Sequence, residues 1–330
     1  MIYYAPHDHL VCGVLLTGNE TYMELSVVVN QMLVLFGILS VGYIAGKTKL
    51  LTREKSAVFA KIIISVAQPC LILFAVMSSS ISISIGSVVI FLLIALGLYV
   101  LMFAIAFPIS RLLCAGKKAP KDDRNLYCYM CMFSNVAFMG FPVCYAIFGP
   151  DSGLYVALLS IVFQMLNFSL GVFLISGKSS RFQIKSLINP PFIAAIISIP
   201  IAIFGFRAPD IIMDITQMLG NITIPGIMLI TGATLSLMPI KNALNEWRVY
   251  PVTLIRLLVV PVLTWAILRQ FITDDMVLGI IVILSGTPVA MSATMLAIRY
   301  GGNEKVASSG LFISTLLSIV TIPLLVYLFI

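Results

Sequence analysis

The sequence predicts an all-α integral membrane protein with ten transmembrane helices, arranged as two inverted repeats of five helices each. Three observations support this fold class. The chain has the composition of a protein dissolved in lipid, it contains ten separate apolar segments, and prolines and glycines recur at matching places in its two halves.

The composition argues against a soluble globular protein. Of 330 residues, 60% are hydrophobic and only 10% are charged, whereas soluble domains have about 25% charged residues. The mean hydropathy is +1.10. A soluble chain of this length could not bury so much apolar surface, so lipid must surround most of it. The net charge of +7 then indicates basic loops at a membrane surface, and no nucleic-acid partner is expected.

Ten apolar segments fit crossings of about 20 residues each. They are expected near residues 26–46, 57–78, 86–110, 125–148, 153–177, 190–206, 211–237, 250–270, 276–298 and 305–329. The connections after odd-numbered segments carry 16 Lys and Arg residues, whereas those after even-numbered segments carry only Arg207 and Arg269. Because basic loops stay in the cytoplasm, both termini are expected outside a multi-pass cell membrane, inner or plasma.

Two basic residues fall in or near segments rather than loops. Lys61 and Arg256 belong to segments two and eight, near their expected cytoplasmic ends. Snorkelling of both side chains to the interface is the default expectation. Attraction of an anionic substrate is the alternative.

The internal repeat rests on breaker residues with similar spacing. The matched pairs are Pro69 with Pro225 at 156 residues, Pro108 with Pro261 at 153, and Gly149 with Gly301 at 152. Five helices per half is an odd number, so the second half enters the membrane inverted. The expected domains are repeats at 24–177 and 190–330, a short cytoplasmic linker at 178–189, and a disordered or mis-assigned tail at 1–23.

Segments four and nine contain breakers in their middle. FSNVAFMGFPVCYAIFG (133–149) includes an Asn, a Gly and a Pro, and VILSGTPVAMSATMLAIRYGG (282–302) breaks at SGTP (285–288). Backbone that is not helical is tolerated at membrane depth only where protein or a water-filled cavity surrounds it. Two such breaks at corresponding positions therefore predict a transport site. Simple proline kinks are the alternative, and Pro108, Pro200, Pro261 and Pro323 are expected to be kinks of that kind.

The ends of half-helices suit a carboxylate, because their N-termini offer free N–H groups and partial positive charge. The candidate substrate-binding residues are Asn135, Phe138, Gly140, Pro142, Thr287, Pro288, Met291, Ser292, Gln68 and Asn221. Gln164 and Asn167 in segment five are weaker candidates. Amides and hydroxyls in membrane helices otherwise often join neighbouring helices. No metal site or cofactor is expected, since Cys128-x-x-Cys131 has no second pair or histidine beside it.

Three stretches resemble the auxin efflux carrier family. They are NQMLVLFGILSVGYIAGKTKLLT (30–52), SNVAFMGFPVCYAIFG (134–149) and GTPVAMSATMLAIRYGGNEKVASSGLFISTLLSIVTIPLL (286–325). The resemblance covers about residues 24–330, and the short loop from Gly177 to Asn189 is similar to bacterial members. It implies a scaffold and a transport domain, with broken helices four and nine crossing at the substrate site. It also implies organic-anion substrates, such as auxin, malate or malonate, and a possible homodimer.

The predicted function is a secondary active transporter of small organic anions, mono- or dicarboxylates, that works by alternating access. The implied fold is shared with sodium/bile-acid symporters, so a sodium-coupled carrier is one alternative and a channel is another. An enzyme is not expected, because both histidines, His7 and His9, lie in the tail and the segments hold no pair of Asp residues. Coupling to H+, to Na+ or to neither stays open.

Overall fold

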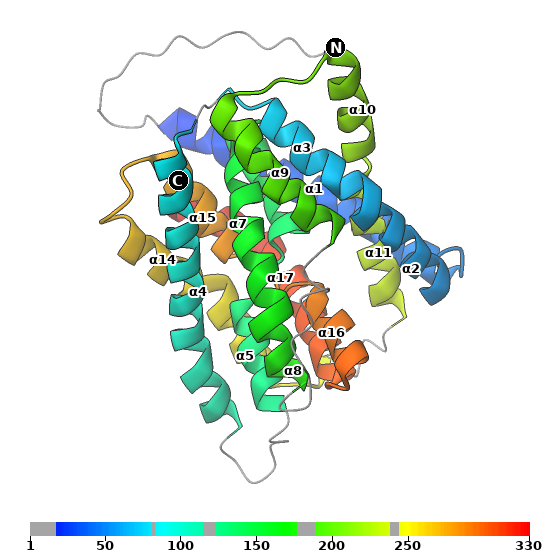
Figure 1. Ribbon diagram of the computed structural model, residues 1–330. Coiled ribbons are helices and arrows are strands. Elements are labelled where there is room, and N and C mark those ends of the chain that lie inside the picture. Colours follow the sequence, from blue (N-terminus) through cyan, green and yellow to red (C-terminus); the bar gives the residue numbers. More distant parts are fainter. Residues whose placement is uncertain (1–17, 81–82, 115–122, 177–188, 238–243) are drawn as a thin grey trace.

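The computed structural model describes residues 18–80, 83–114, 123–176, 189–237 and 244–330. Regular secondary structure within these ranges is helical throughout (Figure 1). The interpretation of residues 1–17 as a tail, and nearly all of the expected linker at 178–189, fall outside the described residues.

The first half of the chain contains eleven of the helical elements described. In order they are α1 (Gly18–Lys47), α2 (Arg53–Ile62), η1 (Ile63–Ala67), α3 (Gln68–Met77), α4 (Ile85–Leu113), α5 (Arg124–Met132), η3 (Val136–Gly140), α6 (Phe141–Phe148), α7 (Ser152–Leu166), η4 (Asn167–Gly171) and α8 (Val172–Ser176). The four η elements of the described chain are π-helical turns within longer helices.

The second half is built in the same way. Its elements are α9 (Pro190–Phe204), α10 (Asp210–Gly220), α11 (Thr223–Ser236), α13 (Val249–Leu254), η7 (Ile255–Val259), α14 (Val260–Leu268), α15 (Asp275–Ser285), α16 (Ser292–Tyr300) and α17 (Glu304–Phe329). All ten predicted segments are therefore helical. Within the described ranges, seven helices are long and apolar enough to cross a membrane, and shorter apolar helices cover Val136–Phe148, Pro190–Phe204 and Asp275–Ser285. The chain is a multi-pass membrane protein.

Three prolines follow π-helical turns at the same distance. Pro69, Pro142 and Pro261 each lie two residues after the last residue of η1, η3 or η7. Proline has no N–H to donate, and its ring clashes with the carbonyl four residues earlier, so a wider turn relieves the clash. By contrast, Pro108, Pro200 and Pro323 lie inside continuous helices, as expected for simple kinks. Pro261 was also expected to be a simple kink, but it follows the π-helical turn η7. That turn contains Arg256.

Helices α1 and α11 pack backbone to backbone through glycine. A Cβ atom at Gly232 would clash with Leu39 O and lie 2.7 Å from Tyr43 N, and one at Gly42 would lie 2.7 Å from the Cα atom of Leu229. Close approach through small residues replaces the hydrophobic driving force that lipid does not provide between helices. The contact joins segments one and seven, which are far apart in the sequence.

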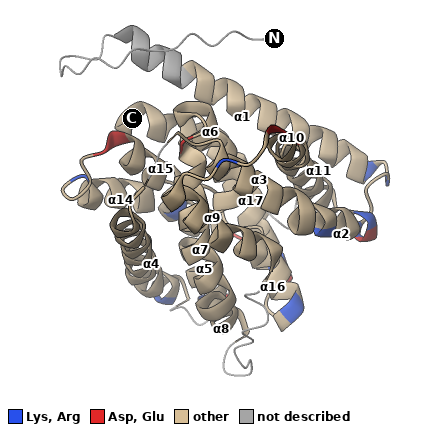
Figure 2. Ribbon diagram, turned by 45° about the horizontal axis from the view of Figure 1, so that its top comes forward, with Lys and Arg blue, Asp and Glu red and all other residues tan. Residues whose placement is uncertain are grey.

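The helices form two neighbourhoods. Helices α2, α3, α10 and α11 lie to one side in both ribbon views, and α3 runs along α9 (Figures 1 and 2). Helix α1 crosses the molecule and ends beside α2 and α11. The other side contains α4, α5, α7, α14 and α15. Charged residues gather toward helix ends and connections, and most of the ribbon between them carries none (Figure 2). Long apolar side chains such as Leu33 and Val100 face outward, as lipid-facing residues do.

Candidate functional site: the crossing of two broken helices

The breaks predicted in segments four and nine are confirmed. Helix α5 ends at Met132, Phe133 is extended with φ −96° and ψ 113°, and the chain becomes helical again at Val136. Helix α15 ends at Ser285, and α16 begins only at Ser292. Local chemistry explains the second break, which contains Gly286 and Pro288, because glycine and proline disfavour the helix interior. The first break lies earlier than its breakers suggested, at Phe133–Asn135, whereas Gly140 and Pro142 lie in the helical turns that follow it.

The two breaks pair with each other in an antiparallel direction. Ser134 and Val289 form an isolated β-bridge. The Asn135 N–H donates to Pro288 O at 2.9 Å, and the Ala290 N–H donates to Phe133 O at 2.9 Å. The Val289 N–H donates to the Ser314 hydroxyl of α17 at 3.1 Å. The open backbone of each break is thus satisfied within the protein, as a non-helical stretch at membrane depth requires.

Arg256 lies at this crossing, so the expectation that it snorkels to the interface is wrong. Its side chain is 0% exposed. Its Nη1 donates to Cys131 O at 2.8 Å and Met132 O at 3.4 Å, and its Nε donates to Thr287 O at 3.2 Å. These carbonyls belong to the last turn of α5 and to the chain just after α15. Half-helix C-termini carry partial negative charge, so they stabilise a cation there. The one sequence signal was a lone Arg near a proline in an apolar segment.

A buried polar cluster joins the two broken helices to segment five. The Tyr129 hydroxyl of α5 donates a short hydrogen bond to Asn167 Oδ1. The Ser292 hydroxyl lies 2.8 Å from the Tyr129 hydroxyl and donates to Asn167 Oδ1 at 3.3 Å. Ser292 is thus placed with Asn167, one of the weaker candidates. Nothing in the sequence pointed to Tyr129, because its partners lie at least 38 residues away.

Most of the remaining candidates at the breaks lie close together. Asn135, Thr287 and Pro288 are buried at the pairing of the two breaks. The Thr287 hydroxyl donates to Leu284 O of its own helix at 3.0 Å, which is a local contact. A Cβ atom at Gly140 would clash with Leu284 and lie 3.5 Å from Thr287, so glycine there allows the two broken helices to approach.

Four candidates lie further from the pairing. Pro142 is buried in the first turn of α6, and Phe138 packs half-buried against the core. Gln68 lines a small pocket beside Phe141 of α6. Asn221 is exposed where α10 ends, and neither described pocket includes it.

A cavity of about 810 Å³ opens beside the second break. Its walls come from α2, η1, α11, α16 and α17, and they include Met291, the residue before α16, and Thr294 in its first turn. Most lining side chains are apolar or carry a hydroxyl. The charged lining residues are Arg53, Lys61, Lys305 and Glu304. Arg53 pairs with Glu304 at 3.3 Å across the gap between α2 and α17. Three cations against one carboxylate make the cavity attractive to an anion.

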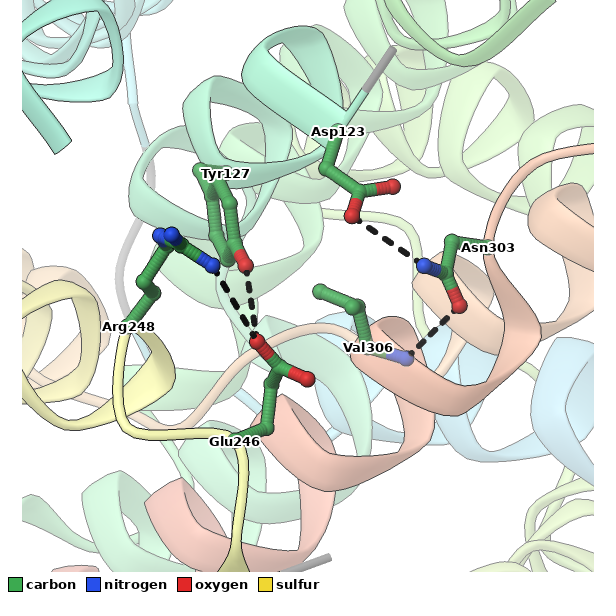
Figure 3. A network of polar contacts seen from close by, with 6 residues as sticks. All are labelled: Asp123, Tyr127, Glu246, Arg248, Asn303 and Val306. Atoms are coloured by element: carbon green, nitrogen blue, oxygen red, sulfur yellow. Dashed lines mark hydrogen bonds and ion pairs between the residues drawn. The ribbon is translucent and has the colours of Figure 1, made fainter. Parts of the chain in front are cut away.

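A second polar network lies at the starts of α5 and α17 (Figure 3). Asn303 caps α17 by accepting from the Val306 N–H at 3.3 Å, and its Nδ2 donates to Asp123 at 3.1 Å. The Tyr127 hydroxyl donates to Glu246 at 3.4 Å. Glu246 also faces Arg248 at 4.0 Å (Figure 3). The network ties the start of α5 to the start of α17 and to the connection before α13.

Comparison with known proteins gives one consistent result. The chain matches the model of a family described as "Membrane transport protein" over residues 27–186 and 179–326. It is 25% identical over 309 residues to a protein of Methanocaldococcus jannaschii named "Uncharacterized transporter", covering 89% of this chain and 96% of that relative. A protein of the same description from Methanothermobacter thermautotrophicus is 29% identical over 194 residues, covering 58% of this chain and 63% of that relative.

Proposed function

Since this chain belongs to the membrane transport protein family, the auxin efflux carriers, we propose that it is a secondary carrier of small organic anions such as mono- or dicarboxylates. One observation carries the proposal. The first turn of a half-helix, α16, borders a cavity whose charged lining is mainly basic. No side chain caps that turn. A carboxylate entering the cavity would meet the positive end of a helix dipole.

The substrate site of this proposal lies at the crossing. It comprises Asn135, Gly140, Pro142, Thr287 and Pro288 at the paired breaks, with Met291 and Ser292 toward the cavity. Phe138 and Gln68 would supply its apolar and amide borders. Asn221, which is exposed at the end of α10, would lie at the edge of this site. The volume of about 810 Å³ falls within the range of about 300–1,000 Å³ that is usual for ligand sites.

Two inverted five-helix repeats, at 24–177 and 190–330, provide the proposed architecture of ten crossings. Two features support it. Gly149 and Gly301 end the corresponding helices α6 and α16 with φ of 73° and 75°, and the breaks pair antiparallel. The basic-loop rule would place both termini outside and the cavity mouth in the cytoplasm. In this orientation the described state is open inward.

Alternating access would then move one helix group against the other. The crossing, held by Arg256 and by the polar network of Figure 3, would move as one body. The packed pair α1 and α11 would belong to the stationary scaffold, together with α2 and α3. A homodimer formed through that scaffold is part of the proposal.

The test is uptake of radiolabelled mono- and dicarboxylates into proteoliposomes, together with thermal stabilisation in detergent. A substrate should raise the melting temperature by mass action, and Asn135→Ala should lose both the shift and the uptake. Ser40→Ala is a matched control, since Ser40 is exposed and its hydroxyl bonds its own helix at Phe36 O. Saturable uptake stimulated by counter-flow supports a carrier, whereas single-channel currents would support a pore. Failure of every carboxylate in both assays would refute the anion proposal.

A further inference from the structure

Three backbone carbonyls converge on one side chain at the crossing. Cys131 O and Met132 O come from the end of α5, and Thr287 O follows the end of α15. The last carbonyls of a helix have no partner within it. At membrane depth an unsatisfied carbonyl costs several kcal/mol, so these ends require a donor or a cation.

Such a convergence has the chemistry of a sodium site. In carriers with discontinuous helices, unwound carbonyls and half-helix C-termini coordinate the coupling Na+ or H+. In this chain the Arg256 guanidinium occupies that place and is bonded to both half-helices at once. Arg256 lies in η7, the π-helical turn that ends two residues before Pro261.

Among the described residues, no carboxylate forms an ion pair with Arg256. The ion pairs found in the described ranges join Arg53 to Glu304 and Arg248 to Glu246. Among the same residues, Nη2 of Arg256 has no hydrogen-bond partner. A full positive charge therefore stays fixed at the crossing, held by neutral carbonyls.

We propose that Arg256 is a built-in substitute for a coupling cation: it joins the two half-helix C-termini and makes transport independent of sodium. The claim that transport is independent of sodium rests on the proposed function, since it presupposes an anion carrier. The claim that Arg256 takes the place of a cation does not, because binding of cations to the carbonyl cluster can be tested without any substrate.

The first experiment measures melting temperature in NaCl and in choline chloride of equal ionic strength, with no anion substrate added. The wild type is expected to melt at the same temperature in both salts. Arg256→Ala should melt lower and recover part of the loss when Na+ or guanidinium is added, because either ion can enter the emptied carbonyl cluster. Arg269→Ala is the matched control in the same segment, since Arg269 lies at the exposed end of α14 over the Trp265 ring.

The second experiment measures anion uptake in the same two salts. Wild-type uptake should not change when sodium is removed. Arg256→Ala should reduce uptake about 100-fold, because several charge-assisted hydrogen bonds are lost at once, and guanidinium should restore part of it. Arg256→Lys, which keeps the charge but reaches fewer carbonyls, should fall between the two.

Two results would overturn the proposal. One is a saturable rise of the wild-type melting temperature with Na+, which would place a sodium site elsewhere. The other is an Arg256→Ala protein whose melting temperature responds to neither cation. If Arg256→Ala does not fold, the wild-type sodium titration and the Arg256→Lys protein decide the matter. If no carboxylate binds or is transported, the proposed function fails while the substrate-free titrations still judge Arg256.

Discussion

Substituting Gly232 by alanine should separate α1 from α11 and destabilise the protein. The new methyl group would meet three backbone atoms of α1: Leu39 O, Tyr43 N at 2.7 Å and Gly42 C at 3.0 Å. Backbone atoms cannot rotate away as the tip of a side chain can, so one whole helix must shift.

The magnitude follows from two opposing effects. Overpacking costs typically about 1–3 kcal/mol, and the rigid surroundings favour the upper end. Alanine regains about 1 kcal/mol over glycine in a helix, which leaves a net loss of about 2 kcal/mol. For a protein of this size that corresponds to a fall of about 3 °C in melting temperature.

The assay is thermal unfolding of purified protein in detergent, followed by tryptophan fluorescence or by aggregation. Gly37→Ala is the matched control, because Gly37 also lies in α1 but has no atom within 4 Å of the added Cβ. Its melting temperature should stay the same or rise slightly. Gly42→Ala should resemble Gly232→Ala. The double variant should cost less than the sum, since both methyl groups force the same separation.

Equal melting temperatures for Gly232→Ala and Gly37→Ala would refute the close packing of α1 against α11. A melting temperature that falls as expected, with transport per folded molecule preserved, would support a stationary role for this pair. Loss of transport without loss of stability would instead indicate that the two helices move relative to each other.

Three further predictions concern the crossing and the cavity. Ser292→Ala should reduce uptake about tenfold by removing the hydrogen bonds of the Ser292 hydroxyl to Tyr129 and Asn167. Unchanged uptake kinetics would limit this cluster to a structural role. Asn303→Ala should lower the free energy of unfolding by about 1 kcal/mol, because α17 loses its N-cap. The loss is measured as a lower melting temperature. A stability equal to the wild type would argue against the network of Figure 3. In a Cys12→Ser, Cys70→Ser background, Thr234→Cys in the cavity wall should react with a membrane-impermeant thiol reagent from the cytoplasmic face only. Labelling of that cysteine from outside would reverse the proposed orientation.

The sequence by itself determined that lipid surrounds most of the chain, where the helices lie, and that segments four and nine are broken. Each of these depends on residues that are neighbours in the chain. Runs of apolar side chains mark helices in lipid, and Gly286 with Pro288 marks where the ninth segment stops being helical. In the fourth segment Asn135 marks the break, whereas Gly140 and Pro142 lie in the helical stretch just after it. The family resemblance came from the same local stretches, and the family match confirmed it.

Only the tertiary structure decided what the breaks contact. Arg256 reaches Cys131, which lies 125 residues earlier, and Ser292 reaches Tyr129 across 163 residues. From hydropathy alone, the Arg256 side chain is expected to extend to the membrane interface. Its actual place depends on the π-turn before Pro261 and on two helix ends that converge from distant segments. No local pattern contains that information, because the energy that holds a buried cation comes from carbonyls that packing brings to it.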